Sequence, residues 1–283
     1  MKRQSVGLLV GSVIAVCVSC ETNPYTERPQ LLLLPLSSEI HLGEQAYQQV
    51  LKDPKTRISH DPKETEPVKR VAARIIEATK QSKYADTANR FAWDVTVIKD
   101  DKTVNAFALP GGKIAVYTGI FPVAKTEAGL AAVLGHEVTH ALARHGAERM
   151  SQGLVAEIAL NAAAIGLQLK GSDPQSSSAI MQALGLGAQV GVLLPFSRAH
   201  ESEADHVGII LAAQAGYDPR EAIHLWERME QAGGGQPPEF VSTHPSHGTR
   251  IKQLEAWMPE ALSYYDRVPH VPSLPLPNLE RAS

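Results

Sequence analysis

The sequence predicts an α+β fold that is mainly α, with one small β-sheet beside the helix that carries its central motif. The chain has 283 residues, which is enough to bury a sizeable core. Aromatic residues make up only 5% of it while Ala, Leu and Gly abound, and this composition favours packed helices over a β-sandwich. Strand-like alternation of apolar and polar residues occurs in residues 91–117, between stretches of helical periodicity.

The elements follow in chain order from apolar spacing and from turn residues. We expect a polar tether at 22–30, helices at 39–51 and 68–79 separated by a proline-containing loop at 52–67, and strands at 91–98, 105–108 and 114–117. Helices are then expected at 126–150, at 153–169, up to Gly216, from Asp218 to 232 and at 246–258. Residues 174–197 hold no charged residue. Their glutamines and glycines favour a packed helix or hairpin, and a membrane-dipping segment is the alternative.

The first residues predict an export signal that ends in a lipid anchor. Two basic residues precede an uncharged apolar run at 6–18, which is shorter than the about 20 residues of a spanning helix. The small residue Ser19 then precedes Cys20, which resembles a bacterial lipobox in which the cysteine becomes the acylated first residue. A plain membrane anchor or cleaved leader is the alternative. We therefore expect a lipid-anchored protein on the periplasmic side of the bacterial cell envelope, at the outer rather than the inner membrane.

Charge and cysteine content narrow the function further. With 27 basic and 30 acidic residues the net charge is −3, whereas a nucleic-acid-binding surface would be strongly basic. We expect no nucleic-acid partner. The two cysteines, Cys17 and Cys20, both lie at the N-terminus, so the rest of the chain has neither an internal disulfide nor a thiolate metal ligand.

The expected divisions are a signal peptide at 1–19, a tether and helix at 20–66, the main domain at 67–265 and a proline-rich extended tail at 266–283.

The motif with the clearest chemistry is His136-Glu137-Val138-Thr139-His140. Residues i and i+4 of a helix share one face, so both imidazoles can reach one metal ion at about 2.0–2.1 Å. Glu137 lies one step round the helix and is placed to act as a general base on water in an open position. Two surface or capping histidines are the alternative for this pattern.

A second acidic pattern supplies a third ligand. Glu201 and Asp205 are again four residues apart, so one carboxylate can bind the metal while the other accepts the spare N–H of a histidine ligand. Glu203 points elsewhere and reads as a solvated or structural acid. A His-His-Glu set with an open position is typical of catalytic zinc, whereas structural zinc is closed by four protein ligands, mostly cysteine.

Together with these motifs, residues 105–112, 197–205, 215–219 and 242–246 resemble the gluzincin metallopeptidases that include HtpX, the CAAX prenyl proteases, Oma-type proteases, BepA and LoiP. The lipobox followed by residues 23–31 looks most like the LoiP-type bacterial envelope lipoproteases. The resemblance implies a zincin-like (gluzincin) fold whose main domain is a zinc metallopeptidase domain. A prenyl-protein processor is disfavoured because the chain lacks convincing spanning helices.

Carried to this chain, the resemblance implies a role for each motif residue. The implied zinc ligands are His136, His140 and Glu201, with Glu137 as general base and acid and Asp205 orienting a ligand. Asn105 and Ala106 are implied on an edge strand that binds extended substrate by strand addition. His244 is implied near the metal, either blocking it or stabilising the oxyanion, with Arg250 as its companion; a helix-capping role is the alternative for His244. The remaining histidines of this region, among them His145, His200, His206 and His224, are expected to be surface or packing residues.

We therefore expect an endopeptidase with one Zn²⁺ per chain that hydrolyses unfolded or misassembled cell-envelope proteins. Glu137 would assist attack by zinc-bound water. Its expected partners are extended polypeptides, the membrane through Cys20, and envelope assembly factors. The alternative is a latent, zinc-containing, chaperone-like binding module in which His244 blocks the metal.

Overall fold

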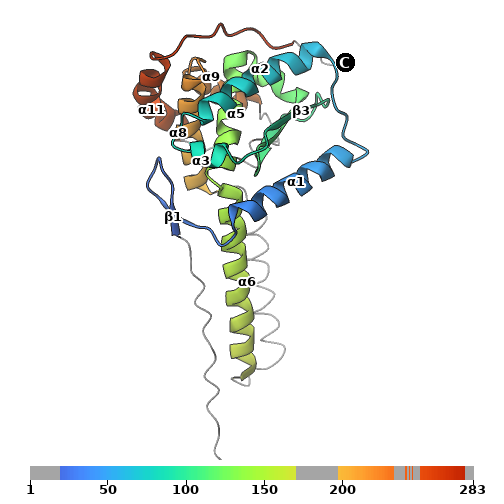
Figure 1. Ribbon diagram of the computed structural model, residues 1–283, viewed down its shortest axis with the longest axis vertical. Helices are drawn as coiled ribbons and strands as arrows, with labels where there is room; N and C mark the ends of the chain where they lie inside the picture. Colours follow the sequence, from blue (N-terminus) through green and yellow to red (C-terminus); the bar gives the residue numbers. More distant parts are fainter. Residues whose placement is uncertain are drawn as a thin grey trace, which may run out of the picture.

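The computed structural model describes residues 20–169, 197–232, 240, 242, 244 and 249–277. These residues are mainly helical with two small sheets, which confirms the predicted α+β class (Figure 1). The expected signal peptide (1–19) and residues 174–196 of the uncharged segment lie outside the described residues. Among the described helices, none combines the length and the apolar character that crossing a bilayer requires.

A three-stranded sheet lies beside the central helix (Figure 1). Strand β5 (Lys113–Tyr117) is in the middle, with β3 (Asp94–Ile98) parallel to it on one side and β4 (Ala106–Leu109) antiparallel on the other. Val116 pairs with Val97 of β3 and with Ala106 of β4. Strand β4 is therefore an edge strand of this sheet, as the sequence predicted for residues 105 and 106. The strand predicted at 91–98 begins only at Asp94, because Phe91 still belongs to the turn after α3 (Ala85–Ala88), where its N–H donates to Ala88 O.

Three helices form the core that positions the motifs: α2 (Pro62–Thr79), α5 (Glu127–Leu142) and α8 (Arg198–Gln214). Every residue of α5 is buried, as expected for a helix that is apolar on most sides. Two glycines set the distance between α5 and α8, because a Cβ on Gly135 would lie only 2.5 Å from the carbonyl oxygen of Gly208. This close approach brings the histidine motif of α5 against the acidic motif of α8.

Helices α9 (Glu221–Ala232) and α11 (Arg250–Tyr265) pack beside α5 and α8, and the short η1 (Thr118–Ile120) and α4 (Phe121–Ala124) connect the sheet to α5. The predicted extended tail is present up to residue 277 and packs on the body, where Leu276 N–H donates to Lys125 O. Two predicted boundaries were wrong. Helix α2 begins at Pro62, capped by Asp61, and α11 continues through Pro259 to Tyr265.

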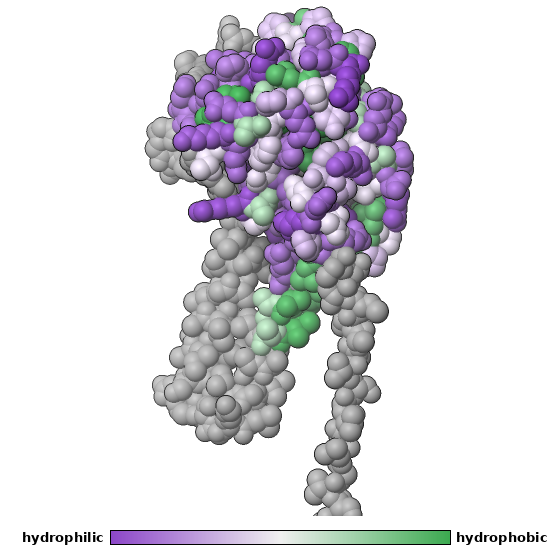
Figure 2. Space-filling model, turned by 90° about the vertical axis from the view of Figure 1, so that its left-hand side faces the viewer, coloured by the Kyte–Doolittle hydropathy of each residue, from purple (hydrophilic) through white to green (hydrophobic). Residues whose placement is uncertain are grey.

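The largest correction concerns the helix predicted at 126–150. The chain breaks between α5 and α6 (His145–Leu169), because Arg144 has a φ of +59°. The Arg144 side chain is held there by ion pairs with Glu39 and Glu21 and donates to Leu34 O. The second predicted helix therefore begins at His145 instead of Gly153, and α6 projects from the body (Figure 1). Leu154, Val155 and Ile158 of α6 are exposed. Figure 2 shows an apolar area at the foot of the body.

The segment expected to be a tether is instead folded against the body. Strand β1 (Cys20–Thr22) pairs antiparallel with β2 (Pro29–Leu31), and Asn23 between them is buried. Its side-chain oxygen accepts from Tyr25 N–H and Thr26 N–H, and these two bonds hold the turn between the strands. We call residues 20–31 the N-terminal hairpin. It leads into α1 (Leu36–Lys52), which covers the expected 39–51 helix.

Candidate active site

Three histidines and one glutamate converge where α5 meets α8. His136 and His140 come from successive turns of α5, Glu201 from the first turn of α8, and His244 from the segment before α11. One ligand atom from each lies within 4.8 Å of the other three, and all four side chains are buried. The i, i+4 spacing of the motif therefore does place both imidazoles on one face, and the structure brings His244 to the same point.

The distances between these atoms suit a tetrahedral ion. Bonds of about 2.0–2.1 Å to a tetrahedral metal separate the ligand atoms by about 3.3–3.4 Å. Here His136 Nε2 lies 3.1 Å from His140 Nε2 and 3.5 Å from Glu201 Oε2, and His140 Nε2 lies 3.4 Å from Glu201 Oε1. His244 Nδ1 is 3.2 Å from His136 Nε2 and 3.0 Å from Glu201 Oε1. Three imidazoles and a carboxylate are donors that zinc prefers.

A second set of contacts orients the ligand atoms. Asp205 Oδ1 lies 2.9 Å from His136 Nδ1, and a carboxylate can only accept, so His136 carries its proton on Nδ1 and directs the Nε2 lone pair at the cluster. Arg250 donates from Nε to Asp205 Oδ2 at 2.5 Å and from Nη2 to Glu201 Oε2 at 2.6 Å. Arg250 thus bridges two buried acids of α8, which is a closer involvement than the companion role to His244 that was expected.

The electrostatics agree with a site built to hold a cation. Burial would raise the pKa of Glu201, but hydrogen bonds with His136, His140 and His244 hold it far below its ordinary value. Burial alone would lower the pKa of His136, but hydrogen bonds to Asp205 and Glu201 raise it to about 10. The pKa of His140 is lowered well below its ordinary value, mainly by burial. The cluster therefore joins a carboxylate to imidazoles in a site closed to bulk water.

Glu137 lies beside this cluster and faces the edge strand. It is buried, and burial raises its pKa, opposed by the nearby His244 and His136 and by the Ala108 backbone of β4. Its Oε1 lies 3.4 Å from His244 Nε2 and accepts no hydrogen bond from the described residues. A buried carboxylate with a raised pKa and an unsatisfied oxygen is suited to accept and return a proton.

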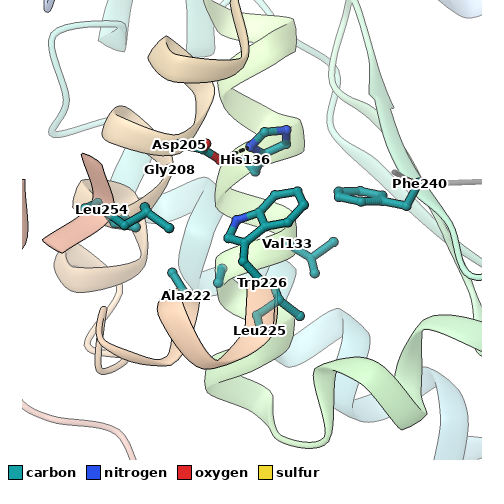
Figure 3. A pocket seen from close by; sticks show the side chains of 11 residues that line it. Val133, His136, Asp205, Gly208, Ala222, Leu225, Trp226, Phe240 and Leu254 are labelled. Carbon is teal, nitrogen blue, oxygen red and sulfur yellow. Dashed lines mark hydrogen bonds and ion pairs between the residues drawn. The ribbon is translucent and has the colours of Figure 1, made fainter. Parts of the chain in front are cut away.

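Aromatic side chains of Trp226 and Phe240 lie against the His136 ring. In Figure 3, Trp226 of α9 lies between His136 and the apolar residues of α9 and α11. The Arg250 guanidinium stacks on Trp226 at 3.7 Å, and Phe240 stacks on the His244 ring at a centroid distance of 4.7 Å. The cavity lined by His136, Trp226 and Phe240 has a volume of only about 10 Å³, so this wall of the site is tightly packed.

Of the remaining predicted residues, Ala106 is the first residue of β4 and Asn105 directly precedes it. Both are buried, and Asn105 Oδ1 accepts the Ala106 N–H at 2.9 Å. Cys20 is the first residue of β1. Helix α5 contacts β4, so the edge strand and the metal-binding face adjoin each other.

Comparison with known proteins decides the family. Peptidase family M48 matches residues 62–258, which is more than half of the chain. The chain belongs to peptidase family M48. Family membership and the buried His-His-Glu-His cluster together make this M48 peptidase a zinc metalloendopeptidase.

Several curated proteins are similar to the M48 peptidase over most of its length. It is 39% identical to the mitochondrial metalloendopeptidase OMA1 of Schizosaccharomyces pombe, over 90% of this chain and 71% of the relative. It is 33% identical to the mitochondrial metalloendopeptidase OMA1 of Homo sapiens, over 91% of this chain but only 49% of the relative. It is also 30% identical to the beta-barrel assembly-enhancing protease of Yersinia pestis, over 52% of this chain and 31% of the relative.

These relatives correct the expected location. The relatives from fungi, a plant and animals are named as mitochondrial proteins, which contradicts the bacterial cell-envelope location expected from the first residues. That expectation depended on residues 1–19, which lie outside the described residues, together with Cys20 and residues 23–31.

Sequence reasoning missed a polar cluster directly behind the candidate metal-binding residues of the M48 peptidase. His145 and His200 were expected to be surface or packing residues, and Glu203 a solvated or structural acid. All three are buried and linked to one another through Arg28 and Glu148. His145 Nδ1 lies 3.0 Å from His140 Nδ1. Spacing gave no signal for this contact, because it depends on the helix break at Arg144. His206 and His224, by contrast, pair with nearby glutamates at the surface.

Proposed function

We propose that this M48 peptidase cleaves extended segments of unfolded or misassembled polypeptides, with Glu137 as general base and acid. The observation that carries the proposal is the position of Glu137, buried between the four-residue cluster and the edge strand β4. His136, His140 and Glu201 are proposed as the zinc ligands. Asp205 and Arg250 are proposed to hold His136 and Glu201 in the orientation that the ligands need.

Peptide hydrolysis at this site would need a bound zinc ion and the carboxylate of Glu137. Bound zinc supplies a Lewis acid that lowers the pKa of a water molecule and polarises the scissile carbonyl. Glu137 accepts the proton of the attacking water through its unsatisfied Oε1 and passes it to the leaving amine. Its raised pKa favours this exchange, because a base with a pKa closer to neutral both accepts and returns a proton readily.

The substrate class follows from the edge strand. A peptide that adds to β4 in extended form would use main-chain hydrogen bonds, which give affinity with little selectivity for side chains. Asn105 and Ala106 at the start of β4 are proposed to contact it. Because folded proteins do not offer a free extended segment of this kind, unfolded or misassembled chains are the proposed substrates.

The second candidate is a latent enzyme that binds polypeptide without cleaving it, and one observation favours it. His244 Nδ1 lies at ligand distance from both His136 Nε2 and Glu201 Oε1, where it would fill the fourth zinc position. In that state His244 also lies against Glu137 and would keep water away from it. Displacement of His244 would then open the site and leave its imidazole near the oxyanion.

The experiment compares cleavage of unfolded casein with cleavage of a folded globular protein by the zinc-loaded full chain. The proposal expects cleavage of casein only, and loss of cleavage after zinc removal with a chelator that zinc addition reverses. Equal cleavage of the folded protein would contradict the substrate class. If the wild type is inactive while His244→Ala cleaves casein, the latent form is the correct candidate.

Acylation of Cys20 remains a separate proposal, supported by the residues around it in the sequence. The intact mass of the full-length chain from its source, compared with that of Cys20→Ser, tests it. A mass that corresponds to an unmodified Cys20 would contradict a lipid anchor.

A further inference from the structure

Behind the candidate zinc ligands lies a buried polar cluster that the proposed reaction does not use. His145 begins α6 and is fully buried, and Glu203 lies two residues after Glu201 on α8 and is also buried. His145 Nδ1 lies 3.0 Å from His140 Nδ1, and His145 Nε2 lies 2.9 Å from Glu203 Oε2. The three side chains form a continuous line, which we call the support chain: Glu203, His145, His140.

The support chain fixes which nitrogen of each ring carries a proton. Both oxygens of Glu203 accept hydrogen bonds from Thr26 or Arg28, as a carboxylate does, and a carboxylate can only accept. The His145 nitrogen that faces it, Nε2, therefore donates. A neutral His145 then has its lone pair on Nδ1, which accepts the N–H of His140 Nδ1. His140 is left with its lone pair on Nε2, the atom that lies 3.1 Å from His136 Nε2 and 3.4 Å from Glu201 Oε1.

Glu203 is itself held by the N-terminal hairpin. Arg28 donates from Nε to Glu203 Oε1 and from Nη2 to Glu203 Oε2, both at 2.9 Å, and Thr26 Oγ1 donates to Glu203 Oε1. The same guanidinium donates to both oxygens of Glu148 on α6, at 2.7 and 2.8 Å. These bonds join segments that are more than 100 residues apart in the sequence.

We propose that His145 and Glu203 are positioning residues for the zinc ligand His140, and that Arg28 and Thr26 make zinc affinity depend on the N-terminal hairpin. The inference rests on the proposed ligand role of His140. A carboxylate thus sets the tautomer of each proposed histidine ligand. Asp205 contacts His136 directly, whereas Glu203 acts on His140 through the imidazole of His145.

The chain offers a matched pair of variants. Glu203 and Glu148 are buried to a similar extent, each accepts from Arg28, and each faces one ring of the stacked pair His145 and His200. In the Glu203→Gln variant the donors Thr26 and Arg28 retain the amide oxygen, which turns its NH₂ toward His145 Nε2. His145 must then carry its proton on Nδ1, against the N–H of His140. Glu148→Gln loses the same charge, but the bonds of Glu148 run to Arg28, His200, Gln30 and Gln152 and to no candidate ligand.

The experiment measures zinc affinity of the apoprotein by competition with a chromophoric chelator, and the visible spectrum of the Co²⁺ form. We expect Glu203→Gln to bind zinc about 10- to 100-fold more weakly than the wild type, the usual effect of losing such a support, and Glu148→Gln to bind it normally. The two variants should lose similar stability to urea. Only the Glu203→Gln variant should change the Co²⁺ spectrum.

Two variants of His145 make the test independent of whether Glu203→Gln folds. His145→Phe removes the acceptor for His140, whereas His145→Asn restores an acceptor near the position of Nδ1. We expect weak zinc binding for His145→Phe and recovery for His145→Asn. Unchanged zinc affinity in folded Glu203→Gln or His145→Phe, or equal loss in Glu148→Gln, would overturn the inference. The His140→Ala variant distinguishes failure of this inference from failure of the proposed zinc ligand set. If this variant binds zinc like the wild type, the proposed ligand set itself is wrong.

Discussion

The spacing of the zinc ligands depends on how closely α5 and α8 approach, and Gly135→Ala perturbs this distance. An added Cβ would lie 2.5 Å from Gly208 O, whereas ordinary contact begins at 3.4 Å, so the helices must separate by about 0.9 Å. Metal bonds tolerate changes of about 0.2 Å, so Glu201 would move out of range of the histidines. We expect weaker zinc binding and a free energy of unfolding lower by about 1–3 kcal/mol, the usual cost of overpacking.

The assay is urea denaturation of the apoprotein together with zinc titration by chelator competition. Gly146→Ala is the matched control, because a Cβ there meets nothing within 4 Å and α6 continues past it. This control should bind zinc normally and gain up to about 1 kcal/mol from helix propensity. The reasoning is refuted if Gly135→Ala is as stable as Gly146→Ala and binds zinc as tightly as the wild type.

Two further predictions concern buried charges. Arg250→Met leaves Asp205 and Glu201 without their shared cation, so urea denaturation should show a loss of about 3–5 kcal/mol, and a change under 1 kcal/mol would contradict the bridging role. Burial alone would raise the pKa of Glu148, but hydrogen bonds with Arg28 and His200 lower it below its ordinary 4.5. Its contribution is therefore present above pH 4.5 and is lost as the pH falls below that value. From pH 7 to pH 3.5 the wild type should lose more stability than Glu148→Gln, and equal losses would contradict this.

Local patterns predicted the parts of the fold and site that depend on local chemistry. The i, i+4 spacing of His136 and His140 and of Glu201 and Asp205 needs only helix geometry, and both pairs lie on helices. The alternation of apolar and polar residues at 91–98 likewise predicted a strand, and β3 (Asp94–Ile98) lies within that range. Spacing alone did not decide whether Glu201 or Asp205 faces the metal site, because this depends on how α8 is rotated about its axis against α5.

The parts that could not be predicted depend on tertiary contacts. An uninterrupted helix over 126–150 would place His145 on a face away from His140, but ion pairs with Glu39 and Glu21 hold Arg144 at positive φ and turn the chain. The polar residues 23–30 look like a tether until Arg28 is seen between two buried acids. The local sequence around Arg28 contains no signal for partners that lie more than 100 residues away.

We propose above all that Glu137 transfers protons at a zinc site formed by α5 and α8. The most direct test compares the zinc content and casein cleavage of the wild type with those of Glu137→Gln, which keeps the size of the side chain. We expect one zinc per chain in both proteins and a rate of casein cleavage that is at least about 100-fold lower in the variant. A fully zinc-loaded Glu137→Gln that cleaves casein at the wild-type rate would contradict it.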